Sequence, residues 1–326
     1  MGKIVRGLII VVAGGSALAI AALSAWVYFA WDRHFSAPYP AIRASTDARI
    51  VDHGHYLVYG PAHCAGCHVA PENQAQLAAG GEPPLAGGLK FPLGDLGTIW
   101  SANITPDNDT GIGKRTDGEL ARVLRYSVHA DGRAVLPFME FQTLSDTDLT
   151  AVISFLRSQA PVPHAVPAMD MRLKGKIALA FFVKPQGPRT APPVSPPSAA
   201  DAVAYGGYLV NAVMQCAGCH TDRSMTDGSD IGPRFAGGWT RVSDTDPKIT
   251  LVTPNLTPDP ETGRIAKWSA ETFVARFRTG KLMAASDMPW ALYGRMTDDD
   301  LRAVYRYLHS LAPVKKDTGA SVRRTG

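Results

Sequence analysis

The sequence has no cysteine outside two copies of one pentapeptide, Cys-Ala-Gly-Cys-His, at residues 64–68 and 216–220. If these thiols are used as the pentapeptide implies, none is left for a structural disulfide. The chain also lacks a strong excess of charge, since its net charge is +4 and residues 50–313 carry −2 once the basic ends are set aside. This balance gives no support to nucleic-acid binding, which calls for a clustered basic surface.

The pentapeptide is the attachment signal for a c-type haem. Its two thiols form thioethers to the porphyrin vinyl groups, and the histidine ligates the iron from the proximal side. A zinc site or a redox dithiol is the alternative. A zinc site would need the two motifs to meet in space or to recruit other ligands, and a redox dithiol would leave the histidine after each pair unexplained. We therefore expect two covalently bound haem c groups, attached at the following residues: Cys64, Cys67 and His68, and Cys216, Cys219 and His220.

The similarity between the two copies extends well beyond the cysteines. Cys64 and Cys216 are 152 residues apart, and the Gly-x-Tyr-Leu-Val stretch from Gly54 returns at the same offset. The Asn-x-Thr-Pro-Asp stretch that begins at Asn103 also returns, at Asn255. Helical spacing dominates each copy and strand alternation is scarce. The sequence thus predicts an all-α fold with two tandem cytochrome c-like haem domains, at residues 45–162 and 201–314.

Local signals place helices inside each copy. Thr116 and Ser145 each stand before a helical stretch with an acidic residue three positions on, which is the pattern of a capping box. Gly54 and Gly206 leave room for the last helix of each copy to cross the helix that leads into the haem motif. We expect these gaps to be filled by two aromatic side chains, Phe155 and Tyr307.

The segments outside the copies have distinct compositions. Residues 163–200 are rich in proline and are predicted to form an extended, semi-rigid connector. The apolar patch at residues 177–183 is too short to span a bilayer, and we expect it to pack between the domains. Residues 315–326 are predicted to be a disordered basic tail.

No charged residue occurs between residues 7 and 31, and these 25 positions are long enough to cross a bilayer as a helix. Residues 1–32 are thus predicted to be an N-terminal transmembrane anchor. Lys3 and Arg6 precede the run, so the positive-inside rule places the haem domains in the periplasm, outside a bacterial inner membrane. A cleaved signal peptide is the alternative, because Ala19-Ile20-Ala21 is a small-x-small site.

Each copy also has a methionine suited to be the sixth iron ligand. Met139 is the one methionine between the first haem motif and the connector. In the second copy we favour Met288, which stands in an Asp-Met-Pro-Trp segment, over Met283 and Met296. A methionine more often fills a core than binds a metal, but its position after the haem motif in both copies favours ligation.

With these elements in place, the chain resembles the mono- and dihaem cytochromes c that include the cytochrome c subunits of membrane-bound bacterial alcohol and gluconate dehydrogenases. The resemblance covers about residues 50–313 and rests on the Asn-Ile-Thr-Pro-Asp stretch, the Met-Pro-Trp segment and the Asp-Leu-x-Ala helix. It implies His68 with Met139, and His220 with Met288, as axial pairs. It also implies a set of residues near the haems: Asn103 and Asn255, and as weaker candidates Trp100, Arg125, Trp268 and Arg278. The best-known subunits carry three haem motifs, whereas this chain has two.

These observations predict an electron-transfer protein and not an enzyme. We expect a membrane-anchored dihaem cytochrome that takes electrons from a periplasmic dehydrogenase or quinol-oxidising complex and passes them to a terminal oxidase or a soluble cytochrome. A dihaem enzyme such as a peroxidase is the alternative. It would need a distal histidine from among His53, His55, His63, His129 and His164.

Overall fold

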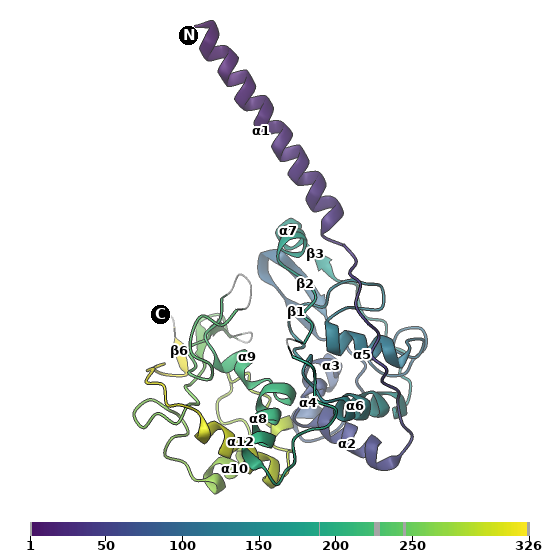
Figure 1. Cartoon of the computed structure of the whole chain (residues 1–326), viewed down its shortest axis with the longest axis vertical. Coiled ribbons are helices and arrows are strands. Elements are labelled where there is room, and N and C mark those ends of the chain that lie inside the picture. Colours follow the sequence, from purple (N-terminus) through teal and green to yellow (C-terminus); the bar gives the residue numbers. More distant parts are fainter. Residues whose placement is uncertain (1, 189, 225–228, 244–245, 325–326) are drawn as a thin grey trace.

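The computed structural model describes residues 2–188, 190–224, 229–243 and 246–324. A long helix, α1 (Lys3–Ala30), stands away from a body made of two halves that lie side by side (Figure 1). We call residues 32–188 the first half and residues 190–324 the second half. The prediction of a mostly helical fold behind one apolar N-terminal helix is confirmed.

The elements of the first half follow in chain order: α2 (Ala48–Tyr59), α3 (Cys64–His68), η1 (Pro71–Asn73), α4 (Gln74–Ala78), β1 (Lys90–Pro92), η2 (Gly94–Leu96), β2 (Gly97–Trp100), α5 (Asp117–Tyr126), α6 (Asp146–Ser158), β3 (Asp170–Met171) and α7 (Leu173–Phe181). Those of the second half are α8 (Ala202–Tyr208), η3 (Leu209–Val213), α9 (Cys216–His220), β4 (Thr240–Val242), β5 (Ile249–Val252), α10 (Ala270–Thr279), α11 (Trp290–Tyr293), α12 (Asp298–Ser310) and β6 (Val322–Arg324).

The core of each half forms where the last long helix crosses the helix before the haem motif, α6 on α2 and α12 on α8. A Cβ on Gly54 would lie 1.9 Å from the carbonyl oxygen of Ala151, and one on Gly206 would lie 1.9 Å from that of Ala303. Only glycine permits so close a helix crossing. The predicted aromatic residues stand next to these contacts, with the Cβ atoms of Phe155 and Tyr307 at 2.8 Å and 3.0 Å from the same positions.

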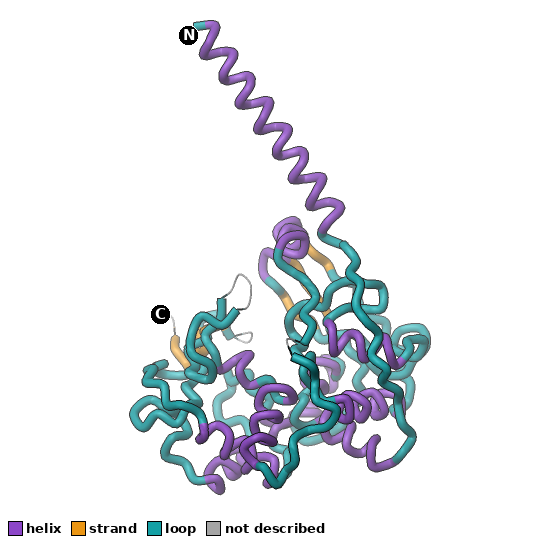
Figure 2. Tube along the Cα trace, viewed as in Figure 1, coloured by secondary structure: helices purple, strands orange, loops and turns teal. Residues whose placement is uncertain are grey.

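The all-α prediction is wrong in one respect, because each half carries a small antiparallel sheet (Figure 2). The strand order is β1-β2-β3 in the first half and β4-β5-β6 in the second. Each described strand has only two to four residues. Strands this short show no alternation of apolar and polar residues in the sequence, so the pattern that predicts strands has nothing to detect.

Two segments outside the copies also differ from expectation. The connector contains β3 and α7, and α7 packs against α1 and η2 and not between the halves. The basic tail is ordered as far as the structure describes it, because β6 pairs with β5 and Lys316 forms an ion pair of 3.3 Å with Asp222. The predicted disorder at residues 325 and 326 lies outside the described residues.

The two halves are joined by a reciprocal pair of hydrogen-bond relays, which we call the tyrosine relays. Ser145 caps α6, and its backbone N–H donates to the Tyr208 hydroxyl of the other half at 3.0 Å. That hydroxyl donates in turn to Asp148 at 2.5 Å. In a normal capping box the third residue of the helix bonds the N-cap N–H directly. Here a tyrosine from the opposite half stands between them.

The second relay repeats the first with the halves exchanged. The N–H of Thr297, the N-cap of α12, donates to the Tyr56 hydroxyl at 3.2 Å. Tyr56 then donates to Asp300 at 2.5 Å. Residues at equivalent positions of the two copies, with Thr297 in the place of Ser145, thus bond in both directions, which is the pattern of a two-fold interface.

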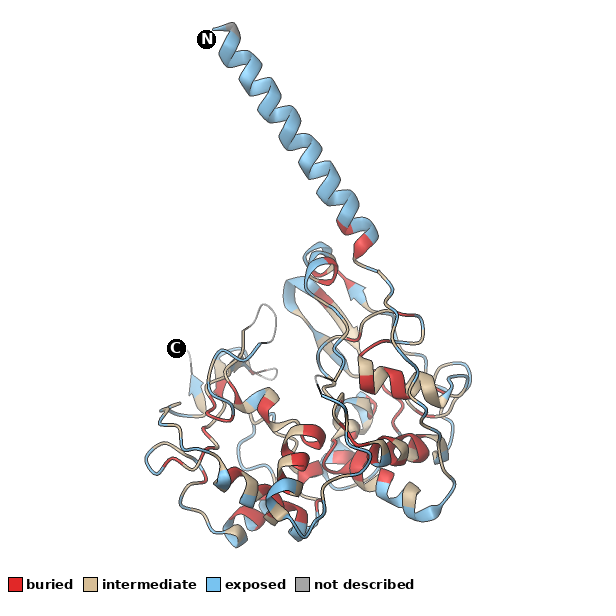
Figure 3. Ribbon diagram, in the orientation of Figure 1, coloured by how far each residue is buried: buried red, intermediate tan, exposed pale blue. Residues whose placement is uncertain are grey.

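Among the described residues, α1 is the one helix long and apolar enough to cross a membrane. Its side chains are exposed along almost the whole length, and burial begins at its last turn with Val27 and Ala30 (Figure 3). A helix with exposed Leu, Ile and Val side chains on every face is unstable in water and suited to lipid.

Candidate functional site

Each Cys-Ala-Gly-Cys-His motif folds as a short helix, α3 or α9, that follows a residue in the left-handed conformation. His63 has φ 45° and Gln215 has φ 55°. This sharp turn lets the motif helix leave α2 or η3 at an angle, with both cysteines and the histidine on one short turn. The two motifs therefore have the same local geometry.

The histidine of each motif is held in one orientation by a backbone carbonyl. The Nδ1 atom of His68 lies 2.8 Å from the carbonyl oxygen of Ala102, and that of His220 lies 3.1 Å from the carbonyl oxygen of Pro254. A carbonyl can only accept, so Nδ1 must carry the proton. Nε2 is then the unprotonated atom, and a lone pair on Nε2 is what an iron ligand requires.

A glycine packs against each of the two carbonyls, of Ala102 and Pro254, that orient the histidines. Gly87 and Gly237 have φ of 73° and 65°, and their N–H groups donate to the carbonyls of His68 and His220. A Cβ on Gly87 would lie 2.4 Å from the Ala102 carbonyl, and one on Gly237 would lie 2.5 Å from the Pro254 carbonyl. The carbonyls that orient the histidines are thus fixed by backbone that only glycine allows.

Asn103 and Asn255 hold the same loops from the other side. Asn255 is fully buried, and its amide donates to Thr262 at 3.0 Å and to the Val314 carbonyl at 2.8 Å. Asn103 makes the same two kinds of bond in the first half. Each asparagine directly follows the residue whose carbonyl binds the histidine. The recurrent Asn-x-Thr-Pro-Asp stretch therefore positions the histidine through its backbone.

The chemistry of the thiols and imidazoles fits covalent haem. The four cysteines are free, and Cys67 and Cys219 are exposed. Burial raises the pKa of Cys64 and Cys216 to about 12 and lowers the pKa of His68 and His220. The histidines are thus neutral, as ligands must be. In the described part of the chain, no group of three or more His, Cys, Asp or Glu side chains is placed to hold a metal ion.

The structure also distinguishes the candidate methionines. Met139 and Met288 are partly buried against the core. Met283 is 42% exposed and Met296 is 1% exposed within the core. A sixth ligand must be sheltered yet free to point away from its own core, and Met296 is committed to packing. Met288 is thus intermediate in exposure between its two alternatives, and its role as the sixth ligand stays a prediction.

Arg125 and Arg278 fix the ends of the loops that carry these methionines. Arg125 is buried and donates to the carbonyls of Gln142 and Leu144. Arg278 donates to the carbonyl of Met296 at 2.6 Å. Both arginines also pair with the first acidic residue of the next helix. Both side chains therefore hold loop backbone, and their place near the haems stays a prediction.

The tryptophan candidates lie in different settings. Trp100 ends strand β2 opposite Lys90. Trp268 packs beside Phe273, with ring centroids 6.5 Å apart, and its carbonyl accepts the Tyr305 hydroxyl. The setting of Trp100 is repeated in the other half by Val252, which ends β5 opposite Thr240.

The segments around the two motifs meet at the interface between the halves. The Tyr293 hydroxyl donates to the Met214 carbonyl at 2.9 Å and lies 3.5 Å from Nδ1 of His63. It therefore touches residues just before both motifs. On the other side, Glu140 forms a 3.0 Å ion pair with Arg223. These contacts bring the segment after each candidate methionine, Met139 or Met288, against the motif region of the opposite half.

The histidines considered for a distal role have other partners. His53 lies 2.7 Å from Asp148, and His55 lies 3.0 Å from Glu82. His164 Nδ1 donates to the Ala86 carbonyl, and His63 contacts the Tyr293 ring. Burial lowers the pKa of His129.

The fold and the site define a class of protein. Residues 203–312 match the family model described as cytochrome c, and a cytochrome c domain implies covalently bound haem c.

Comparison with characterised proteins confirms the resemblance inferred from the sequence. The chain is 31% identical over 291 residues to the cytochrome c subunit of a quinone-dependent alcohol dehydrogenase from Gluconobacter oxydans, covering 82% of this chain and 56% of the relative. It is 28% identical over 294 residues to the fructose dehydrogenase cytochrome subunit of Gluconobacter japonicus, covering 86% and 56%. It is 28% identical over 291 residues to the gluconate 2-dehydrogenase cytochrome c subunit of Pantoea cypripedii, covering 84% and 62%. The chain thus spans somewhat more than half the length of these relatives.

Proposed function

We propose that this protein is a membrane-anchored dihaem cytochrome c that carries electrons on the periplasmic side of the bacterial inner membrane. Its donor is a periplasmic dehydrogenase or a quinol-oxidising complex, and its acceptor is a terminal oxidase or a soluble cytochrome. The observation that carries the proposal is the repeated histidine geometry, in which a backbone carbonyl holds Nδ1 and leaves Nε2 as a ligand in both halves. The names of the relatives support a dehydrogenase as donor.

In this proposal residues 45–162 and 201–314 are two haem domains. Cys64 and Cys67, and Cys216 and Cys219, attach the porphyrins. His68 with Met139, and His220 with Met288, would hold the two irons. When bound, haem c supplies an iron that alternates between the ferrous and ferric states. The residues of this chain would act by position, because a histidine and a methionine on each iron would leave no iron open to substrate.

The contacts of Tyr293 and Glu140 support transfer of electrons within the chain, since they bring the two motif regions together across one interface. Residues 1–32 are the proposed anchor. The basic residues Lys3 and Arg6 favour an N-terminus in the cytoplasm. This orientation exports both motifs to the compartment where haem c is attached.

The ligation is tested with the purified full-length protein. Mass spectrometry should show two covalent haems per chain, and the reduced protein should bind carbon monoxide slowly or not at all. Met288→Ala should change the absorption spectrum and open one iron to carbon monoxide, whereas Met283→Ala, a matched control five residues away, should do neither. Met288→His should lower the potential of one haem and keep both covalently bound.

Two outcomes would contradict the proposal. Rapid, stoichiometric binding of carbon monoxide to one haem of the unaltered protein would favour a dihaem enzyme. A native N-terminus near residue 22, or release of the protein from membranes by carbonate, would show that α1 is a cleaved signal and not an anchor.

A further inference from the structure

Helix α7 (Leu173–Phe181) carries an apolar stripe that faces solvent. Leu173, Ile177 and Phe181 follow one another at intervals of four residues and are 70%, 38% and 40% exposed. Residues four apart lie on one face of a helix. Phe182, the next residue, is 58% exposed. An exposed apolar face of this size on a small helix marks a surface that meets another apolar phase.

The opposite face of α7 is anchored to the first half. A Cβ on Gly175 would lie 2.0 Å from the carbonyl oxygen of Leu96 in η2, so the helix backbone lies directly on that turn. Leu179 and Ala180 are buried. Lys174 forms an ion pair of 2.7 Å with Asp95. The helix therefore cannot roll to bury its apolar stripe, because the face it would have to release is already packed.

The stripe lies beside the end of α1. The rings of Trp26 and Phe181 have centroids 6.4 Å apart, and the Lys176 ammonium lies 4.7 Å from the Trp31 ring centroid. Figure 1 shows α7 at the side of the first half from which α1 leaves, seen nearly end-on while α1 runs in the plane of the picture. The two helix axes thus cross steeply. If α1 crosses a membrane, as the proposed function requires, α7 lies along the membrane surface.

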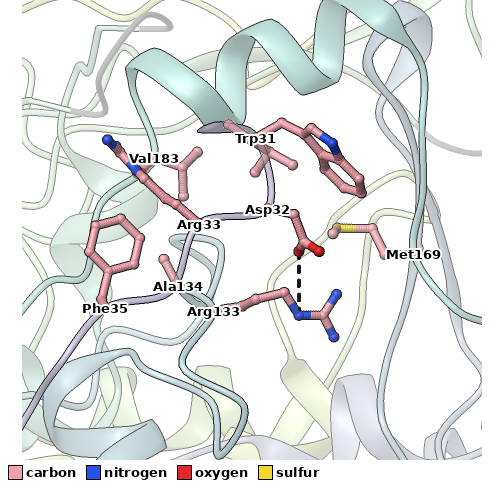
Figure 4. A pocket seen from close by; sticks show the side chains of 9 residues that line it. Trp31, Asp32, Arg33, Phe35, Arg133, Ala134, Met169 and Val183 are labelled. Carbon is pink, nitrogen blue, oxygen red and sulfur yellow. Dashed lines mark hydrogen bonds and ion pairs between the residues drawn. The ribbon is translucent and has the colours of Figure 1, made fainter. Parts of the chain in front are cut away.

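The segment that links α1 to the first half is held in place as well. Trp31, Asp32, Arg33 and Phe35 line a small pocket of about 30 Å³ together with Arg133, Met169 and Val183 (Figure 4). The Phe35 N–H donates to the Gly132 carbonyl at 2.7 Å. The Phe35 carbonyl accepts a hydrogen bond of 3.0 Å from Arg122. The position of α7 relative to the end of α1 is therefore determined by packing and not by a free tether.

The charges around the stripe match a lipid surface. Four basic residues lie on or next to α7, namely Arg172, Lys174, Lys176 and Lys184. The acidic residues nearby are Asp32, which lines the small pocket with Leu179 of α7, Asp95 and Asp170. Aromatic residues at the end of α1, namely Trp26, Tyr28 and Phe29, are exposed at the same level. An apolar stripe with a basic rim beside an aromatic belt is the composition of an interfacial helix.

We propose that α7 is an interfacial membrane helix, which inserts its apolar stripe into the outer leaflet beside α1 and sets the orientation of the first half against an anionic lipid surface. The inference rests on the anchor in the proposed function. A docking site for another protein would use the same exposed residues, but it would not require the stripe to stand at the level where α1 leaves the body.

The test uses the full-length dihaem protein in vesicles of phosphatidylcholine and phosphatidylglycerol that contain a trace of a diazirine-bearing phospholipid. After illumination, mass spectrometry locates the lipid adducts. We expect adducts on α1 and on residues 173–182, and none near Ile231, an apolar residue of the second half that is 66% exposed. The variant Leu173→Glu with Phe182→Glu should reduce adducts on α7 about tenfold and leave those on α1 unchanged. Ile231→Glu is the matched control and should change neither.

The outcomes separate this inference from the proposed anchor. Adducts on α1 without adducts on α7 would overturn the inference and leave the anchor intact, and the stripe would then be a protein docking site. Absence of adducts on α1 would overturn the anchor itself. Both substituted residues are largely exposed, so the variant should keep both haems and its absorption spectrum. Unchanged α7 adducts in that variant would also refute the assignment of Leu173 and Phe182.

Discussion

The tyrosine relays predict that a substitution in one half destabilises a helix end in the other. Tyr208→Phe removes one hydroxyl, which accepts from the Ser145 N–H and donates to Asp148. A hydrogen bond to a charged group contributes about 1.5–3 kcal/mol and a neutral one about 1 kcal/mol. Because the side chain of Asp148 is only 4% exposed, water cannot fully replace the lost donor. We expect the free energy of unfolding to fall by about 2–4 kcal/mol.

Two measurements on the full-length holoprotein in detergent check this expectation. Guanidinium unfolding, followed by circular dichroism, gives the free energy. Hydrogen exchange gives the location: Tyr208→Phe should speed exchange at Ser145 in the first half, and Tyr56→Phe should speed exchange at Thr297 in the second. The control is Tyr305→Phe, since that hydroxyl donates to a neutral carbonyl within its own half. It should cost about 1 kcal/mol and leave both N-caps unchanged.

The reasoning would be refuted if the interface variants lost no more stability than Tyr305→Phe. It would also be refuted if faster exchange appeared only in the half that carries the substitution, because the hydroxyl would then not serve the opposite helix.

Two further predictions concern pH and the histidine carbonyls. The hydrogen bond to Asp148 raises the pKa of His53 above 6.5, against the opposing effect of burial, with Asp300 adding a smaller upward effect. The protonated form of His53 should stabilise the folded protein fully below pH 6.5, and this stabilisation should be lost as the pH rises through the raised pKa. In unfolding midpoints measured across a pH series, His53→Gln should therefore flatten the decline in stability with rising pH. An unchanged slope would exclude His53 as the source of the decline. Gly237→Ala should displace the Pro254 carbonyl and weaken the hydrogen bond that it accepts from His220. The imidazole then gives less electron density to the iron, so the potential of one haem should rise in a redox titration. Gly280→Ala introduces the same backbone strain at φ 72° with no neighbour within 4 Å, and an equal shift in that control would contradict the mechanism.

The sequence predicted the local features that depend on nearby residues. The capping box at Thr116 is present, with Glu119 returning to the N-cap N–H. The glycines at the helix crossings were predicted from the repeat and are confirmed by the contacts of Gly54 and Gly206. These features follow from short-range rules, in which one residue type and one spacing determine one geometry.

Features that depend on the placement of distant segments were not predicted. Ser145 begins a helix as expected, yet its N–H bonds Tyr208 and not Asp148. Nothing near Ser145 in the sequence indicates that partner, because it comes from the other half. The strand β3 and helix α7 were missed for a related reason, since the prolines on both sides of residues 170–181 suggested an extended connector. Packing on η2 and α1 overrides that tendency.

The tyrosine relays also connect four helices into a closed ring. Helix α2 packs on α6, and α6 is capped through Tyr208 of α8. Helix α8 packs on α12, and α12 is capped through Tyr56 of α2. Because α2 and α8 lead into the two haem motifs, neither can tilt without pulling on the helix cap of the opposite half. The ring therefore restrains the helices that lead into the two motifs, and the angle between α2 and α8 is set by the whole ring and not by the connector.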